Sequence, residues 1–243
     1  MFTYCRVTLA AILVLSIIIS CSKSTRTECP LRTPKADREA ELIALCLSGE
    51  IVAPDNLYRQ VQRDLAAIRA AFGDTFELIR RIEFWPPWVP GRLMIGFYDS
   101  TVQQIRAGEY HGWDQLNEEY HVAEIDTGIL YIMGIVTLVF RGRLHPYRLE
   151  EIYEGLPGAW AVSATGYVGD GPNVHPRQTM GGLTYLFRNG WGDCPAGCIN
   201  NEYWYFVLEA NDPVFVGYWP EYREERQPEW WSEARLNRRQ YCD

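Results

Sequence analysis

The stretch GRLHPYRLEEIYEGLPGAWAVSATG, residues Gly142–Gly166, places a helix and a strand one after the other. Pro146 suits the first turn of a helix, where its missing N–H removes no hydrogen bond, and apolar side chains then recur every three or four residues from Leu149 to Leu156. The Pro-Gly pair after Leu156 ends the helix, because proline cannot continue it. Trp160–Ala164 then has the composition of a strand. The stretch therefore predicts a helix that leads directly into a strand.

Towards the N-terminus, the pattern adds three strands and a second helix. Two strands, His121–Ile125 and Ile129–Phe140, are separated by Asp-Thr-Gly, which is a hairpin signal. A helix with Ser100 or Thr101 at its N-cap precedes them, weakened by two internal glycines, and Leu93–Phe97 forms a strand before it. The order strand, helix, strand, strand, helix, strand is that of the ferredoxin-like split βαβ motif. We therefore expect an α+β protein that contains a ferredoxin-like unit.

The cadence of Gly142–Gly166, a helix leading to Leu-Pro-Gly and a strand, resembles the end of subtilisin-type propeptides. The resemblance spans at most Arg92–Gly166, within the unit that we place at residues 91–166. It implies the ferredoxin-like fold of those propeptides and their action as protease inhibitors.

Residues 38–90 are expected to hold two helices and a rigid linker. Glu39–Leu47 has its apolar residues on one face, and Asp55 can cap a longer helix that ends at Gly73. Three prolines in Phe84–Gly91, FWPPWVPG, argue against a regular helix or a central strand. We interpret this segment as an ordered linker packed on the core, and the alternative is an aromatic platform for a ligand.

The C-terminal third predicts a three-stranded antiparallel segment at residues 167–220. Gly166–Gly182 is rich in glycine and proline, which is typical of a loop. The three strands are expected at Leu183–Phe187, Glu202–Glu209 and Val214–Tyr218. Charged residues of both signs are frequent in 221–243, which predicts a charged tail with a solvent-exposed helix.

Cys194 and Cys198 are expected to form a disulfide in the loop between the first two of these strands. Proline and glycine around them suit a turn that brings the two Cα atoms within bridging range. The usual redox spacing is Cys-x-x-Cys, and a zinc site would need ligands that the scattered histidines do not supply, so we disfavour both alternatives. Cys46 has the surroundings of a small buried hydrophobic residue, and Cys29 with Cys242 forms a second candidate pair.

The N-terminus has the layout of an exported lipoprotein. Arg6 precedes thirteen residues without a charge, a run too short for a spanning helix but typical of a signal peptide. Ile18-Ile19-Ser20-Cys21 resembles the lipobox of bacterial lipoproteins, which implies cleavage before Cys21 and its acylation. We expect a signal peptide at 1–20, a flexible tether at 21–37, and a domain outside the cytoplasm at a cell or outer membrane. The alternative is an ordinary secretory leader.

The charge balance and the missing motifs exclude several function classes. The formal net charge is −8 at pH 7, which disfavours nucleic acid as a partner because phosphate binding needs clustered lysine and arginine. The sequence contains no nucleophile elbow, phosphate loop, dinucleotide fingerprint or HExxH helix. We therefore predict a non-enzymatic protein without a cofactor or a metal site.

The leading hypothesis is an envelope lipoprotein that binds a peptide, a protein or another extracytoplasmic ligand. Its candidate ligand contacts are Trp191, Asp193 and Asn200, in the loop region Asn189–Asn201 that holds the cysteine pair. The convergence of this region with Gly166–Gly182 on one polar pocket would support the hypothesis.

Two further hypotheses stay open at this stage. One is a protease-inhibitor or propeptide-like module, which depends on the order of the predicted elements. The other is a hydrolase with an unrecognised site, which would group His175 with Asp170 or Asp193. Oxygen-bearing side chains in these loops are also calcium ligands by type, but they lack the regular spacing of a calcium loop.

Overall fold

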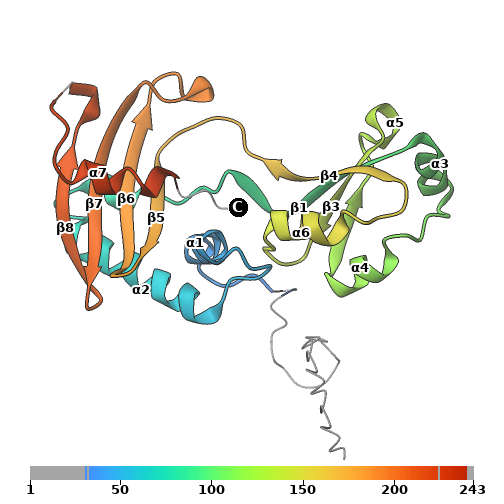
Figure 1. Ribbon diagram of the computed structural model, residues 1–243, viewed down its shortest axis with the longest axis horizontal. Coiled ribbons are helices and arrows are strands. Elements are labelled where there is room, and N and C mark those ends of the chain that lie inside the picture. The colour runs from blue at the N-terminus through green and yellow to red at the C-terminus, as the bar shows by residue number, and fades with distance from the viewer. Residues whose placement is uncertain (1–30, 32, 224, 240–243) are drawn as a thin grey trace, which may run out of the picture.

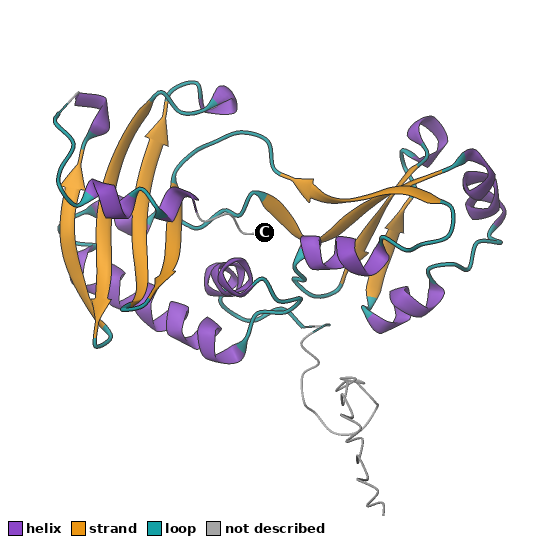
Figure 2. Ribbon diagram, in the orientation of Figure 1, coloured by secondary structure: helices purple, strands orange, loops and turns teal. Residues whose placement is uncertain are grey.

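The computed structural model describes residues 31, 33–223 and 225–239, and its strands form two separate four-stranded antiparallel sheets (Figures 1 and 2). The predicted signal peptide, the lipobox with Cys21, and the candidate pair Cys29 and Cys242 lie outside the described residues. Within them the protein combines helices with antiparallel sheets, so the α+β prediction is confirmed at that level.

The first sheet has the strand order β2-β3-β1-β4, with every neighbouring pair antiparallel. Its strands are β1 (Trp88–Phe97), β2 (Val122–Asp126), β3 (Ile135–Phe140) and β4 (Ala159–Gly166). The helices of this unit are α3 (Asp99–Ala107), α4 (Asp114–Glu119), α5 (Leu130–Met133) and α6 (Pro146–Tyr153). Alternate residues of β1, such as Leu93 and Ile95, pack with Leu149 and Tyr153 of α6 in one buried cluster.

The second sheet has the strands in sequence order and is covered on both faces (Figure 1). Its strands are β5 (Asn173–Thr179), β6 (Gly182–Trp191), β7 (Asn200–Glu209) and β8 (Asp212–Trp219). One face packs on α1 (Arg38–Ser48) and α2 (Asp55–Phe72), and the other on α7 (Trp231–Ala234) and the short 3-10 helices that flank it. Double coverage explains why most residues of β6 and β7 are buried in succession instead of alternating with exposed ones.

The predicted tail and the predicted loop are both wrong in part. Residues 221–239 are not a solvent-exposed helix, because Trp231, Ala234 and Asn237 are buried against the second sheet. The stretch Gly166–Gly182 contains β5, so this sheet has four strands where the sequence predicts three. Pro176 favours a loop in the sequence because proline is rare in strands, but β5 lies at the edge of the sheet, where proline is tolerated.

The linker prediction is also partly wrong, because β1 begins at Trp88 and contains Pro90 although it is a central strand. The pairing with β4 is irregular between Trp88 and Leu93, so Pro90 interrupts no regular ladder.

The helix predicted from Ser100 or Thr101 divides into α3 and α4 at Gly108, which has a positive φ of 72°, and Tyr98 occupies the N-cap. The strand predicted from Ile129 begins only at Ile135, after the short helix α5.

Two smaller predictions at the N-terminal helices need correction. Pro54 occupies the N-cap of α2, whereas Asp55 is its first residue and forms an ion pair with Lys35. Cys46 is buried on α1 as the sequence predicts, but it is disulfide-bonded and does not act as a simple hydrophobic residue. The disulfide between Cys194 and Cys198 is confirmed, with 4.1 Å between the Cα atoms.

Candidate functional site

Two chain segments connect the sheets, one before β1 and one after β4 (Figure 1), and hydrogen bonds hold them together. The Trp85 N–H donates to the Asn173 side-chain oxygen at 2.9 Å, and the Asn173 amide donates back to the Trp85 carbonyl at 2.9 Å. The Tyr167 N–H donates to the carbonyl of Pro87 at 3.1 Å. The amide side chain of Asn173 therefore replaces a backbone partner and fixes the course of both segments.

A cavity of about 560 Å³ opens between these two segments, and we call it the junction cleft. Its walls come from Phe84–Pro87, from Tyr167–Asn173 and from the side chains of Cys46, His175, Pro176, Asn237 and Arg238. The volume falls within the range of small-ligand and peptide-side-chain pockets. A junction between two packed bodies is also a common place for such a pocket.

Two exposed aromatic rings mark the cleft. Trp85 and Tyr167 are both 46% exposed, and their rings meet edge to face with 6.1 Å between the centroids. The Arg38 guanidinium lies 4.8 Å from the centre of the Trp85 ring. Large aromatic side chains lose favourable burial when they stay in water, so an ordered pair of this kind is characteristic of a binding surface.

His175 contributes an unpaired polar atom to the wall of the cleft. Its Nε2 is shielded from water and has no hydrogen-bond partner among the described residues. Burial lowers the pKa of His175 to about 3, and the positive charges of Arg238 and Arg188 contribute to that lowering. The imidazole is therefore neutral near pH 7 and suits hydrogen bonding to a ligand better than binding an anion.

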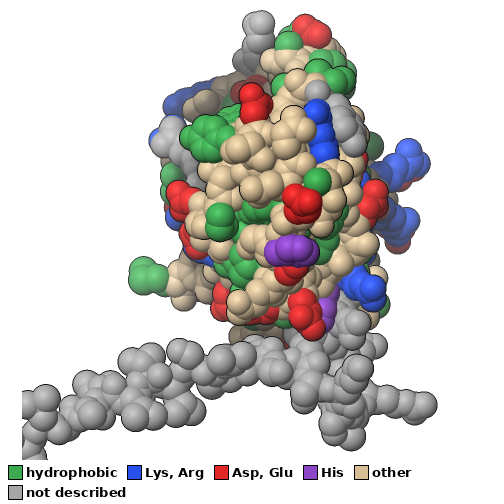
Figure 3. All heavy atoms as spheres, turned by 90° about the vertical axis from the view of Figure 1, so that its right-hand side faces the viewer, with side chains coloured by type: hydrophobic (Ala, Val, Ile, Leu, Met, Phe, Trp, Pro, Cys, Tyr) green, Lys and Arg blue, Asp and Glu red, His purple; other side chains and the backbone are tan. Residues whose placement is uncertain are grey.

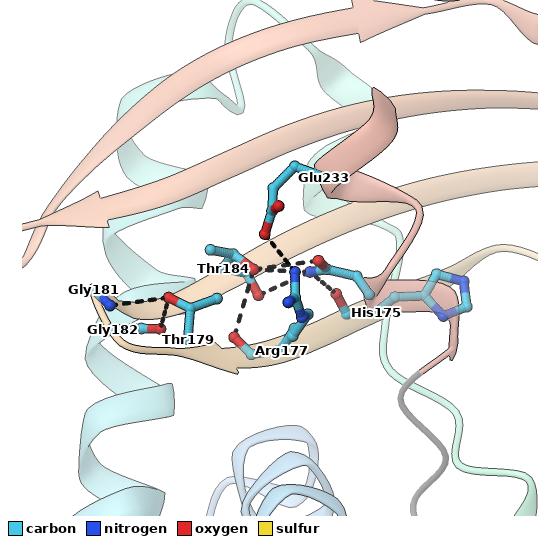
Figure 4. Close-up of polar contacts among 8 residues, drawn as sticks. His175, Arg177, Thr179, Gly181, Gly182, Thr184 and Glu233 are labelled. Carbon is cyan, nitrogen blue, oxygen red and sulfur yellow. Dashed lines mark hydrogen bonds and ion pairs between the residues drawn. The ribbon is translucent and has the colours of Figure 1, made fainter. Parts of the chain in front are cut away.

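The C-terminal segment holds His175 in place through the backbone. The Asn237 amide donates to the His175 carbonyl at 2.9 Å and to the Thr184 carbonyl at 3.2 Å. Arg177 on β5 also pairs with Glu233 of α7. In Figure 4 the His175 imidazole points away from Thr184 and Arg177, so these contacts leave the ring unengaged.

Asp170 ties the segment after β4 to the cysteine loop. Its carboxylate accepts from both terminal nitrogens of Arg188, one of them at 2.6 Å, and from the Cys198 N–H at 3.2 Å. Its own N–H donates to the Cys194 carbonyl at 2.8 Å. The hydrogen bonds from Arg188 hold the pKa of Asp170 well below its usual value. Asp170 therefore connects the two loops through its hydrogen bonds with Cys194 and Cys198, whereas its ion pair is with Arg188 of β6.

The predicted ligand residues lie near this contact but outside the junction cleft. Trp191 and Asn200 are cross-strand partners at the ends of β6 and β7, and Asp193 follows in the turn with a positive φ of 35°. The Trp191 ring packs against Tyr222, with 5.0 Å between the centroids. The sequence pattern favours this loop over Trp85, although the segment Phe84–Gly91, rich in proline and tryptophan, is the signal that indicates the cleft.

This geometry gives little support to the hydrolase hypothesis or to a calcium site. His175 and Asp170 do line the same cleft, but the Asp170 carboxylate is occupied by Arg188. Within the described ranges, no contact brings a nucleophilic side chain next to His175. The same residues contain no group of three metal-ligating side chains. Throughout the same ranges, every helix is too short or too polar to span a bilayer.

No family model, no curated protein and no solved structure matches this chain. Its function is therefore inferred from its residues and their geometry.

Proposed function

We propose that this protein is a lipid-anchored cell-envelope protein that binds an extended peptide in the junction cleft. The observation that carries the proposal is the perpendicular, half-exposed pair of Trp85 and Tyr167 at a cleft where His175 Nε2 has no hydrogen-bond partner among the described residues. Aromatic-lined grooves of this kind recur in proteins that bind extended, proline-containing segments. The few polar groups would then fix the orientation of the peptide.

The charges around the cleft favour an acidic peptide. The protein as a whole is acidic, yet Arg38 stacks on Trp85 and Arg238 lines the cleft. Within the described part of the chain Arg38 forms no ion pair with a carboxylate, and Arg238 donates to the hydroxyl of Tyr203. A peptide with a proline or aromatic residue beside a carboxylate would therefore match both the rings and the cations.

Replacing Trp85 by alanine is expected to weaken peptide binding by about 30-fold, the loss typical of a central aromatic anchor. The probe is an acidic, proline-containing peptide titrated against the full chain and followed by calorimetry. The matched control is Trp160→Ala, because Trp160 is similarly exposed, at 52%, but lies on β4. If the Trp85 and Trp160 variants bind equally well, or if only an uncharged oligosaccharide binds, the cleft does not serve peptides.

The anchor is tested separately from the cleft. Cys21→Ala is expected to release the protein almost completely from the membrane fraction, because several acyl chains supply most of the binding free energy and each buried methylene contributes about 0.8 kcal/mol. Fractionation and intact-mass measurement would report retention and acyl mass. Cys5→Ala is the matched control, since this cysteine lies in the leader. An unchanged membrane fraction in the Cys21 variant would refute the lipobox assignment.

A second candidate function follows from the first sheet. Its strand order β2-β3-β1-β4, with helices on one face, supports a ferredoxin-like unit and with it the resemblance to protease propeptides. We infer protease inhibition as the alternative activity of this unit. Absence of inhibition of a subtilisin-type protease by the full chain would eliminate it, whatever the result for the cleft.

A further inference from the structure

The edge strand β4 carries an exposed tryptophan, Trp160, at an irregularity in its pairing with β1. The pairing of β1 with β4 shifts between Gly96 and Phe97, so Trp160 is the extra residue of a bulge. Its ring lies over Gly96, where an added Cβ would come within 2.5 Å of the indole. Gly96 therefore makes room for the ring, which remains half exposed.

Trp160 stands between two hollows of different character. One, of about 680 Å³, is bordered by the exposed side chains of Tyr98, Ile132 and Met133, with buried Leu130 in its wall. The other, of about 470 Å³, is lined by three glutamates of α6 and its end, Glu150, Glu151 and Glu154, and by β4 itself. Figure 3 shows the end of the molecule that carries α5, where hydrophobic side chains lie among carboxylates.

The glutamates leave negative charge beside the strand. Glu150 accepts a hydrogen bond from the Ala164 N–H, and Glu151 pairs with Arg148 at 2.6 Å. Glu154 takes part in no ion pair among the described residues. Two cationic side chains of a ligand could therefore pair with Glu154, which has no ion pair among the described residues, and with Glu151, which is held only by its exposed pair with Arg148.

The edge of β4 also offers backbone groups. Because the Ala164 N–H points outward to Glu150, Val162, two residues earlier, presents its own backbone on the same side. β4 is the terminal strand of the sheet order, so no strand formed by the described residues covers this side.

We propose that the β4 edge binds an extended, basic segment of another protein, which adds as a fifth strand and places an apolar side chain beside Trp160. The observation that selects this occupant is charge complementarity: the apolar ring is flanked by the glutamates of α6. A second copy of this chain is a poorer occupant, because antiparallel pairing of two β4 edges would bring two sets of these glutamates together. This surface is separate from the junction cleft.

The test uses the full chain and a peptide of alternating lysine and valine, with a peptide of alternating glutamate and valine for comparison. We expect the basic peptide to bind and Trp160→Ala to weaken binding by about 30-fold, as for a buried aromatic anchor. Trp85→Ala, at the junction cleft, should leave the affinity unchanged. The same variant pair therefore separates failure of this proposal from failure of the proposed function.

Nonspecific attraction to an acidic protein is controlled by charge-matched variants. The double change Glu151→Gln and Glu154→Gln should weaken binding, while Glu109→Gln with Glu118→Gln, which removes the same charge elsewhere, should not. Three results would overturn the proposal: equal binding of the acidic peptide, equal loss in both double variants, or wild-type affinity in Trp160→Ala. Sedimentation showing a dimer that Trp160→Ala dissociates would also overturn it, in favour of self-association.

Discussion

Trp88→Ala is expected to lower the free energy of unfolding by about 3–5 kcal/mol, the range for removal of a fully buried tryptophan. The Trp88 side chain is completely buried, and its ring lies 4.9 Å from that of buried His145, between centroids. Trp88 opens β1 of the first sheet, yet it belongs to the core of α1, α2 and the second sheet. Its loss should therefore weaken the connection between the two cores as well as the core itself.

Urea unfolding followed by far-ultraviolet circular dichroism would measure this effect without relying on tryptophan fluorescence. Trp85→Ala is the matched control, three residues earlier and half exposed, and we expect it to cost about 1 kcal/mol or less. A Trp88 variant within about 1 kcal/mol of the wild type would show that the two cores are stable without this contact.

Asp170→Ala is expected to cost about 3 kcal/mol, at the low end of the range for breaking a buried ion pair, because water reaches one side of Asp170. Arg188 is only 4% exposed, so the change leaves its guanidinium buried with neutral side-chain partners, Asn201 and Tyr203, and no carboxylate in their place. The Cys198 N–H loses its acceptor too. Asp74→Ala breaks the exposed pair with Arg80 and should cost less than about 1 kcal/mol in the same urea titration.

The Asp170 pair also predicts an acid limb in stability. Because the pKa of Asp170 is lower in the folded protein than in the unfolded chain, its contribution is complete above the ordinary aspartate pKa and decreases as the pH falls below about 4. Asp170→Asn should lose stability near pH 7 and show a shallower decline on acidification. An Asp170→Asn variant that parallels the wild type at every pH would contradict the assigned pair.

Local signals predicted the elements whose sequence determines them. Pro146 occupies the expected position at the first turn of α6, since it acts on its own backbone. The Cys194–Cys198 bridge was predictable for the same reason, because the turn that closes it lies between the two residues. The second sheet has its strands in sequence order, whereas in the first sheet β1 pairs with β3 and β4, and these pairings depend on contacts distant in sequence.

The errors arise where tertiary position overrides a local rule. Pro90 and Pro176 lie in strands because one sits at an irregular pairing and the other at a sheet edge, and neither circumstance is visible in sequence. Residues 221–239 look solvent-exposed from their charge, but the apolar side of Trp231 and Ala234 covers a sheet face that the sequence does not assign to them.

The candidate site was difficult to predict for a related reason. Trp85 and Tyr167 are more than eighty residues apart, and only the return of the chain after β4 brings their rings together. His175 reaches the cleft from β5, a strand that was expected to be a loop. The exposed tryptophan was noticeable in the sequence, whereas its partners were not.

The hydrogen bond between Tyr167 and Pro87 has an architectural consequence. The polypeptide leaves and re-enters the larger body at neighbouring points, so residues 89–166 form a topological insertion between α2 and the second sheet, while Trp88 stays in the core of the larger body. In such an arrangement the strand pairing of the host does not include the inserted module, and side-chain contacts such as the pair of Arg143 with Glu41 join the two bodies.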